Sequence, residues 1–534
     1  MIPAQGGRRP RDVRVVVVGA GFSGLGAAIR LREAGFRDVL VLEKADRPGG
    51  TWRENTYPGC ACDVPSTLYS YSFAPHTAWS RMFAGQEEIR RYLATTAERY
   101  GLAEVLRTGV QVYGARWDAG TARWSLDTSD GPYRAAVLVM ATGPWHVPRP
   151  LDVPGLDAFA GPVLHTARWD DGVDLTGKRV AVVGSGASAV QVVPAVADRA
   201  AAVHLFQRTA QWVLPKPDLP LPPAFHRAVG RLPGARRGLR ASQYALQEGI
   251  GYAFRHPRLA LLIEAAARAH LRLAVADPRL RRALTPVYRL GCKRLLTSST
   301  YYPTLGRSHV HLHATAVGAV RGNTVVGADG TLVEADVLVT ATGFRVGDMP
   351  LSRTLCGVEG RTLHDVWDGE PQAYLGTTVS GFPNLFLLLG PNLLGGSTSA
   401  ITVLEAQLDH LTAALAHLDR SGDGALEVRP AVQATHNSAV QEALATTVYN
   451  TGGCTSYYLT PSGRNTFAWP WSTPRLTRRL RHFDPASYTW SAPARPRTAP
   501  AVPAPAVAAP AQESRATGTT GSPTRTVPGS RTSG

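Results

Sequence analysis

The sequence predicts an α/β protein with two Rossmann-like dinucleotide-binding domains and a helical insertion. Two apolar runs, at residues 15–18 and 180–183, lead directly into the glycine-rich turns 19–24 (GAGFSG) and 184–189 (GSGASA). Such a turn opens a mononucleotide-binding unit, because its glycines let a pyrophosphate approach the backbone at the start of the following helix. Two further apolar strands end in Ala-Thr-Gly, at 141–143 and 341–343, and we expect each to close one unit.

The residue expected to meet the ribose differs between the two turns. Glu43 stands nineteen positions after Gly24, and Arg208 stands nineteen positions after Ala189. A carboxylate accepts hydrogen bonds from ribose hydroxyls, whereas an arginine suits the extra 2′-phosphate of NADP. The first turn therefore predicts a site for FAD and the second a site for NADPH, as in a flavoprotein reductase or monooxygenase. The turn and ribose residues expected in these sites are Gly19, Gly21, Gly24 and Glu43 for FAD, and Gly184, Ser185, Gly186, Ser188, Ala189 and Arg208 for NADPH.

The order of these patterns predicts that one domain interrupts the other. We expect a discontinuous FAD-binding domain at residues 11–150 and 346–484, and an NADPH-binding domain at 151–220 and 290–345. Residues 221–289 have the pattern of an arginine-rich helical insertion. Residues 485–534 are rich in Pro, Ala, Ser and Thr, a composition that buries too little apolar surface to offset its ordering entropy, so we predict a disordered tail.

The formal net charge of +17 raises the question of a polyanionic partner. Only four of the 57 basic residues are lysines, and the arginines are spread through predicted helices rather than interleaved with aromatic residues. We therefore expect no nucleic-acid partner. Part of the charge can instead attract the phosphates of NADPH.

The remaining composition sets the expected location. No apolar run reaches membrane-spanning length and the N-terminus has no secretory signal pattern, so we expect a cytoplasmic protein with no membrane partner. The five cysteines include no Cys-x-x-Cys and no metal-ligand spacing. The sequence therefore predicts neither a metal site nor a disulfide.

Three longer patterns resemble those of Baeyer–Villiger monooxygenases. Residues 159–170 (FAGPVLHTARWD) match the family fingerprint FxGxxxHxxxW(P/D), in which His165 and Trp169 belong to a linker rather than to the reacting groups. Residues 50–63 (GTWRENTYPGCACD) match a second family pattern, and residues 291–303 (GCKRLLTSSTYYP) resemble the segment that carries the family's active-site arginine. The likeness extends from about residue 13 to residue 482.

This resemblance implies a reaction and a set of residues. In the family, reduced flavin and O2 give a C4a-peroxyflavin, whose anion attacks a ketone and needs a permanent cation beside it. The resemblance assigns that role to Arg294, oriented by Asp63, and arginine keeps its charge at any working pH. It also implies that Lys293, Arg208 and Thr209 hold the 2′-phosphate of NADPH. The other residues expected near FAD are Gly50, Thr51, Trp52, Asp63, Tyr69 and Asn392.

The expected activity is therefore insertion of one oxygen atom from O2 next to the carbonyl of a lipophilic ketone, giving an ester or lactone. Two alternatives stay open, which are oxidation of a sulfur or nitrogen atom and a non-oxygenating NADPH–flavin reductase. A disulfide reductase is disfavoured, because Cys60-Ala-Cys62 does not fit its redox pair. Tyr457 and Tyr458 stand where many relatives have tryptophan, so the ketone itself is left open, as is the oligomeric state.

Overall fold

Each glycine-rich turn follows an inner strand of its own sheet, β1 in the first sheet and β8 in the second. The structure is a computed structural model that describes residues 9–76, 78–395, 398–422 and 424–491. One sheet is built from residues 11–140 together with 355–356 and 385–387, and the other lies within residues 163–340.

The first sheet has the strand order β17-β4-β5-β6-β1-β2-β3, and β18 pairs with β6. At its centre β1 lies parallel to both β2 and β6, and the valines of β1 are buried because helices and loops cover both faces. The strands are β1 (Arg11–Val18), β2 (Val39–Leu42), β3 (Leu106–Arg107), β4 (Val112–Asp118), β5 (Arg123–Thr128), β6 (Tyr133–Met140), β17 (Leu355–Cys356) and β18 (Leu385–Leu387).

The second sheet has the order β12-β9-β8-β16-β7, with all neighbours parallel. Its strands are β7 (Val163–His165), β8 (Arg179–Val183), β9 (Ala202–Phe206), β12 (Val310–His313) and β16 (Val337–Thr340). Helices α4 (Ala187–Ala197) and α9 (Tyr301–Leu305) pack together beside it. A small antiparallel sheet of β13 (Val317–Arg321), β14 (Thr324–Gly327) and β15 (Leu332–Glu334) lies nearby, as does the short pair β10 (Val213–Leu214) and β11 (Leu296–Thr297).

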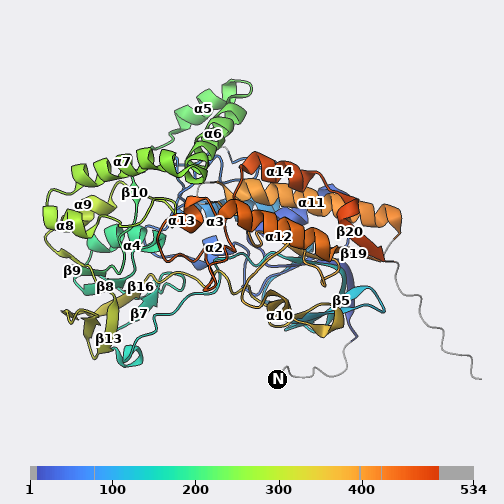
Figure 1. Cartoon of the computed structure of the whole chain (residues 1–534), viewed down its shortest axis with the longest axis horizontal. Coiled ribbons are helices and arrows are strands. Elements are labelled where there is room, and N and C mark those ends of the chain that lie inside the picture. Colours follow the sequence, from blue (N-terminus) through green and yellow to red (C-terminus); the bar gives the residue numbers. More distant parts are fainter. Residues whose placement is uncertain (1–8, 77, 396–397, 423, 492–534) are drawn as a thin grey trace, which may run out of the picture. The chain divides into compact units, whose positions relative to one another are not determined.

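Helices complete both parts. In the first part they are α1 (Phe22–Glu33), α2 (Thr51–Glu54), α3 (Gln86–Arg99), α10 (Leu363–Trp367), α11 (Ala400–Ser421), α12 (Pro430–Leu444), α13 (Val448–Thr451) and α14 (Thr473–Arg481), and α11 packs against α1 and α14. The expected insertion contains α5 (Pro223–Arg231), α6 (Ala235–Arg255), α7 (Pro257–Ala274) and α8 (Pro278–Ala283). Figure 1 shows α5 and α6 projecting from the body.

The predicted start of the disordered tail at residue 485 is wrong, because residues 485–491 are folded. Residues 485–487 form a short 3-10 turn, and β20 (Tyr488–Ser491) pairs antiparallel with β19 (Ala425–Val428). Tyr488 is buried and bonds to His410, so its aromatic side chain gives these residues the apolar contact that the composition of the tail lacks. The predicted disorder of residues 492–534 lies outside the described residues. No helix in the described ranges is long and apolar enough to cross a membrane.

Two buried histidines make the stability of this fold depend on pH. Burial lowers the pKa of His410, on α11, and of His436, on α12, from 6.5 to about 4. Both imidazoles take up a proton more readily in the unfolded chain. Above pH 6.5 the two histidines therefore do not lower the free energy of unfolding. As the pH falls towards 4, each of them lowers it by about 3 kcal/mol.

Urea unfolding across this pH range tests the dependence. We expect the free energy of unfolding to fall below pH 6.5, and to fall less steeply in His436→Gln. A free energy that stays constant between pH 6.5 and pH 4.5 would contradict the assignment.

Candidate active site

The first glycine turn packs closely against the end of β6. Gly19 has φ +104°, and a Cβ placed there would lie 2.7 Å from the carbonyl oxygen of Ala141. The carboxylate of Glu43, at the end of β2, accepts hydrogen bonds from the backbone N–H of Ala20 at 2.7 Å and of Ala45 at 2.9 Å. These bonds fix the carboxylate beside the turn, which is the position that a ribose-binding residue requires.

A second loop closes on this turn. Gly50 has φ +53°, and its Cβ would approach Gly21 Cα to 2.9 Å, so only glycines permit this contact. The loop brings the exposed Thr51 and the buried Trp52 to the same place. The indole N–H of Trp52 donates to the hydroxyl of Tyr69 at 3.2 Å, and the two rings meet edge to face. These residues form one wall beside the first turn.

The second turn has the same form and leads into α4. A Cβ on Gly184 (φ +125°) would lie 2.5 Å from the carbonyl oxygen of Ala341, whereas Gly186 faces open space. The hydroxyl of Ser185 donates to the carbonyl oxygen of Thr209 at 2.7 Å, which ties the turn to the segment that follows β9. Ser188 is partly buried and Ala189 is fully buried in the first turn of α4.

Two cations converge beside the second turn. Burial, and then the positive charge of Arg208, lowers the pKa of Lys293, so the two charges lie near each other. Among the described residues neither side chain has an acidic partner within ion-pair distance. The Lys293 ammonium group instead lies 5.1 Å from the ring centre of Tyr288. Two adjacent cations without an anion form a suitable site for a phosphate.

Arg294 and Asp63 form an ion pair between two distant segments. The guanidinium Nη2 donates to Asp63 Oδ1 at 2.7 Å, across 231 residues of sequence. Asp63 lies in the loop after α2, and Arg294 lies just before β11. The negative charge of Asp63 raises the pKa of Arg294 further above its ordinary value. Because the arginine side chain is still 33% exposed, its remaining N–H groups can reach a ligand.

Aromatic side chains surround this arginine. The guanidinium carbon lies 5.8 Å from the ring centre of Trp145. Phe467 stacks on Tyr458 at 4.9 Å and meets the edges of Tyr457 and Trp145. Tyr457 is 42% exposed, so it is the member of this group that a ligand can reach most readily. Sequence reasoning did not identify Trp145 or Phe467, because single aromatic residues outside a motif carry no signal of proximity.

A pocket adjoins this aromatic group. It lies at the ends of β6 and β18, between the segments that follow the two Ala-Thr-Gly turns. Its lining includes Thr142, Gly143, His146, Arg345, Leu389 and Phe467. The predicted Asn392 lies next to it, buried with φ +55°. Its amide donates to the carbonyl oxygens of Asn465 at 2.8 Å and Ala468 at 3.0 Å. In this structure Asn392 therefore holds two segments together, and contact with FAD stays a prediction.

The helix after the second turn supports the Asp63 loop. Gln191, on α4, accepts from the hydroxyl of Tyr57 at 2.7 Å and donates to the carbonyl oxygen of Ala61 at 2.9 Å. Lys216, which the sequence did not indicate, donates to the carbonyl oxygen of Cys62 at 2.9 Å. Hydrogen bonds therefore connect helix α4 to the loop that carries Asp63.

The expected linker residue His165 lies where the two parts of the chain cross. Its Nδ1 lies 3.0 Å from the backbone nitrogen of Ala167, and its Nε2 lies 3.3 Å from the hydroxyl oxygen of Thr342. Both ring nitrogens are therefore occupied by the linker itself, in agreement with a structural role.

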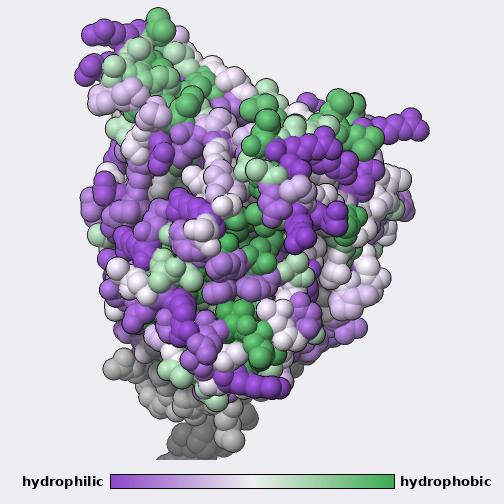
Figure 2. Space-filling model, turned by 90° about the vertical axis from the view of Figure 1, so that its left-hand side faces the viewer, coloured by the Kyte–Doolittle hydropathy of each residue, from purple (hydrophilic) through white to green (hydrophobic). Residues whose placement is uncertain are grey.

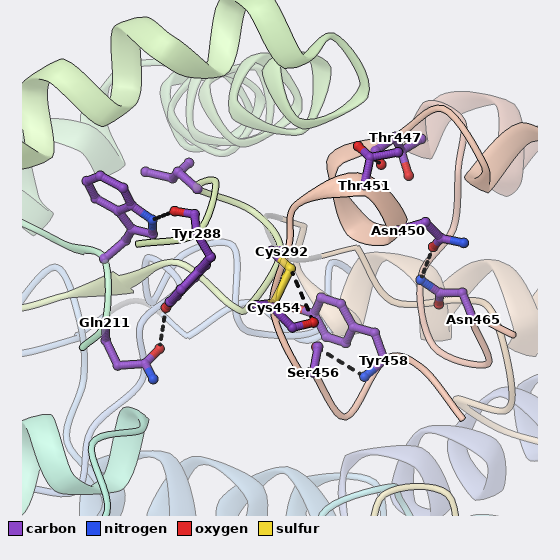
Figure 3. Close-up of a disulfide and its surroundings, with 12 residues drawn as sticks. Gln211, Tyr288, Cys292, Thr447, Asn450, Thr451, Cys454, Ser456, Tyr458 and Asn465 are labelled. Atoms are coloured by element: carbon purple, nitrogen blue, oxygen red, sulfur yellow. Dashed lines mark hydrogen bonds between the residues drawn. A yellow bond between two sulfur atoms is a disulfide. The ribbon is translucent and has the colours of Figure 1, made fainter. Parts of the chain in front are cut away.

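The expectation of no disulfide is wrong. Cys292 and Cys454 form a disulfide that joins segments 162 residues apart (Figure 3). Spacing rules did not find it, because the fold rather than a local motif brings the two cysteines together. Cys292 precedes Arg294 by two residues and Cys454 precedes Tyr457 by three. The bond therefore fixes the arginine segment against the tyrosine segment.

Comparison with known proteins agrees with this architecture. Residues 16–232 match the family model described as pyridine nucleotide-disulphide oxidoreductase. The chain is 47% identical to a Baeyer–Villiger monooxygenase of Streptomyces coelicolor A3(2), over 90% of this chain and 93% of that relative.

Two solved structures have the same fold. One is the closed form of cyclohexanone monooxygenase (TM-score 0.81, 27% identity, covering 91% of this chain and all of that one). The other is OTEMO in complex with FAD and NADP (TM-score 0.82, 25% identity, covering 90% of this chain and all of that one). The predicted pair of cofactors is therefore confirmed at the level of related structures.

The disulfide makes a testable contribution to stability. Because it closes a long loop, its loss should lower the free energy of unfolding by about 2–5 kcal/mol. Thermal unfolding of the wild type should shift to lower temperature with dithiothreitol, whereas Cys292→Ser/Cys454→Ser should start lower and show no shift. Cys356→Ser, which removes a buried free thiol elsewhere, is the control and should keep the shift. A wild type that does not respond to the reductant would contradict the prediction.

Proposed function

We propose that this chain, which belongs to the Baeyer–Villiger monooxygenase family, inserts one oxygen atom of O2 beside the carbonyl of a lipophilic ketone to give an ester or lactone. FAD and NADPH are the cofactors in this proposal. The observation that carries it is the Arg294–Asp63 pair, a permanent cation held beside the aromatic ring of Trp145.

The glycine turns fit the two dinucleotides. Gly19 and Gly184 let each turn pack against the carbonyl group of Ala141 or Ala341, where a side chain would collide, and Gly186 of the second turn faces open space that suits a pyrophosphate. The fixed carboxylate of Glu43 suits the unphosphorylated ribose of FAD, and Arg208 with Lys293 suits the 2′-phosphate of NADPH. Bound FAD, once reduced by NADPH, supplies the two-electron activation of O2 on which the reaction depends.

Arg294 acts through its fixed positive charge. Attack on a ketone carbonyl places negative charge on the carbonyl oxygen, and a cation already in position stabilises that charge without reorganisation. Asp63 holds one guanidinium nitrogen at 2.7 Å and so leaves the other N–H groups to point at the reacting atoms. The pair therefore orients the charge, and the neighbouring aromatic side chains cover part of it.

The substrate class follows from the lining of the site. Trp145, Tyr457 and Phe467 offer apolar ring surfaces, so a lipophilic ketone is favoured over a charged one. One structural relative is a cyclohexanone monooxygenase, which supports a cyclic ketone as the first compound to test. Sulfur or nitrogen oxidation has less need of a fixed cation, so the ion pair favours the ketone reaction. We also expect the enzyme to work in the cytoplasm.

Replacement of Arg294 by alanine tests the role of the cation. With a cyclic ketone, Arg294→Ala should lower the rate of ester or lactone formation by about 10²–10³-fold, while NADPH still reduces the flavin at a similar rate. Arg307→Ala is the matched control, because Arg307 forms an ion pair of the same 2.7 Å length with Asp198 at the surface. Undiminished product formation in Arg294→Ala would overturn the assignment.

Replacement of Arg208 tests the phosphate site separately. Losing one charged contact to the 2′-phosphate should raise the KM for NADPH by about 10–100-fold. The KM for NADH, which has no 2′-phosphate, should change little. Steady-state kinetics with both nucleotides measure the ratio. An equal rise in both KM values would show that Arg208 does not read the phosphate.

A further inference from the structure

Exposed apolar side chains concentrate on the helical insertion and its flanks. In the described part of the chain, nine of the fourteen exposed large hydrophobic residues fall between residues 219 and 287: Leu219, Leu232, Leu246, Tyr252, Leu259, Leu261, Leu262, Leu273 and Val287. Figure 2 shows hydrophobic residues among hydrophilic ones at the projecting top of the molecule, where Figure 1 places α5 and α6. A cluster of this kind marks a surface that another body covers.

Helix α7 shows the pattern most clearly. Five of its exposed apolar residues recur every three or four positions and so form one line along the helix, which consists of Leu259, Leu262, Ala266, Ala269 and Leu273. Leu261 and Ala265 are also exposed, outside this line. We call this line the α7 stripe. Leu262 is 71% and Leu273 is 89% exposed, although the opposite face of the same helix is already buried through Ala260, Ala267 and Leu271. The helix is therefore apolar on two faces, of which the fold uses one.

The charge around the stripe is strongly positive. Residues 221–289 contain thirteen arginines, no lysine and three acidic residues, a formal net charge of +10. Two of the three acids are occupied within the fold, since Glu264 is buried against Arg289 and Glu248 pairs with Arg255. The third, Asp277, caps α8.

The arginines next to the stripe remain available. Arg258 and Arg272 are exposed on α7 and form no ion pair within the described residues. The outward charge beside the α7 stripe is therefore cationic.

We propose that the α7 stripe and its arginines bind the surface of an anionic lipid bilayer, with α7 lying in the plane of the headgroups. Leucines on one face and arginines beside them are the two features that hold a helix at such a surface. A second copy of this chain fits less well, because it would bring two surfaces of charge +10 together. The sequence predicted no membrane partner because no segment spans a bilayer, but a helix that lies on the surface needs no such segment.

Sedimentation with lipid vesicles tests the proposal on the purified full-length protein, and it needs no enzyme activity. We expect the protein to sediment with vesicles of phosphatidylcholine mixed with phosphatidylglycerol, to stay in solution with phosphatidylcholine alone, and to be released by high salt. Leu262→Asp/Leu273→Asp should bind anionic vesicles at least about tenfold more weakly than the wild type. Leu332→Asp is the matched control, because Leu332 is 67% exposed on β15, outside the insertion, and this variant should bind like the wild type.

A second pair of variants tests the charge. Arg258→Ser/Arg272→Ser should weaken binding, and Arg37→Ser/Arg361→Ser, which removes two exposed arginines elsewhere, should not. The proposal is overturned if the wild type does not sediment with anionic vesicles at low salt, or if the leucine variant sediments equally well. It is also overturned if the wild type is a dimer that the leucine variant dissociates while vesicles bind neither protein.

Discussion

The ion pair between Arg294 and Asp63 is the interaction on which the rest of the site depends. It joins the loop after α2 to the segment before β11, and it fixes the position of a positive charge that does not titrate at working pH. A charge of this kind is useful only if it is held in place and shielded from water, since bulk solvent would screen it. The contacts around the pair hold it in place, and the aromatic ring of Trp145 covers part of the guanidinium.

Three connections from different parts of the fold hold the pair in place. Gln191 ties the nucleotide-binding helix α4 to the loop that carries Asp63, and the Cys292–Cys454 disulfide ties the segment of Arg294 to that of Tyr457. Phe467 then packs the tyrosines against Trp145, beside the guanidinium. Helix α4 and the Arg294–Asp63 pair are therefore linked through short contacts.

The sequence predicted the parts of the site that local patterns encode. The glycine turns, Glu43 and Arg208 have fixed spacings, and the Arg294–Asp63 pair followed from family patterns that bracket both residues. The disulfide, Trp145 and Lys216 could not be predicted in this way, because tertiary packing alone brings them to the site. The strand Tyr488–Ser491 was missed for a related reason, since its pairing with β19 and the burial of Tyr488 outweigh a composition typical of disorder.

The most direct test of this account is to follow the oxygen atom. The protein is incubated with FAD, NADPH, a cyclic ketone and ¹⁸O2, and the product is analysed by mass spectrometry. The account predicts a lactone that carries one ¹⁸O atom in the ring position, formed in step with NADPH consumption. Consumption of NADPH with all of the labelled oxygen recovered as hydrogen peroxide, across a range of lipophilic ketones, would contradict it.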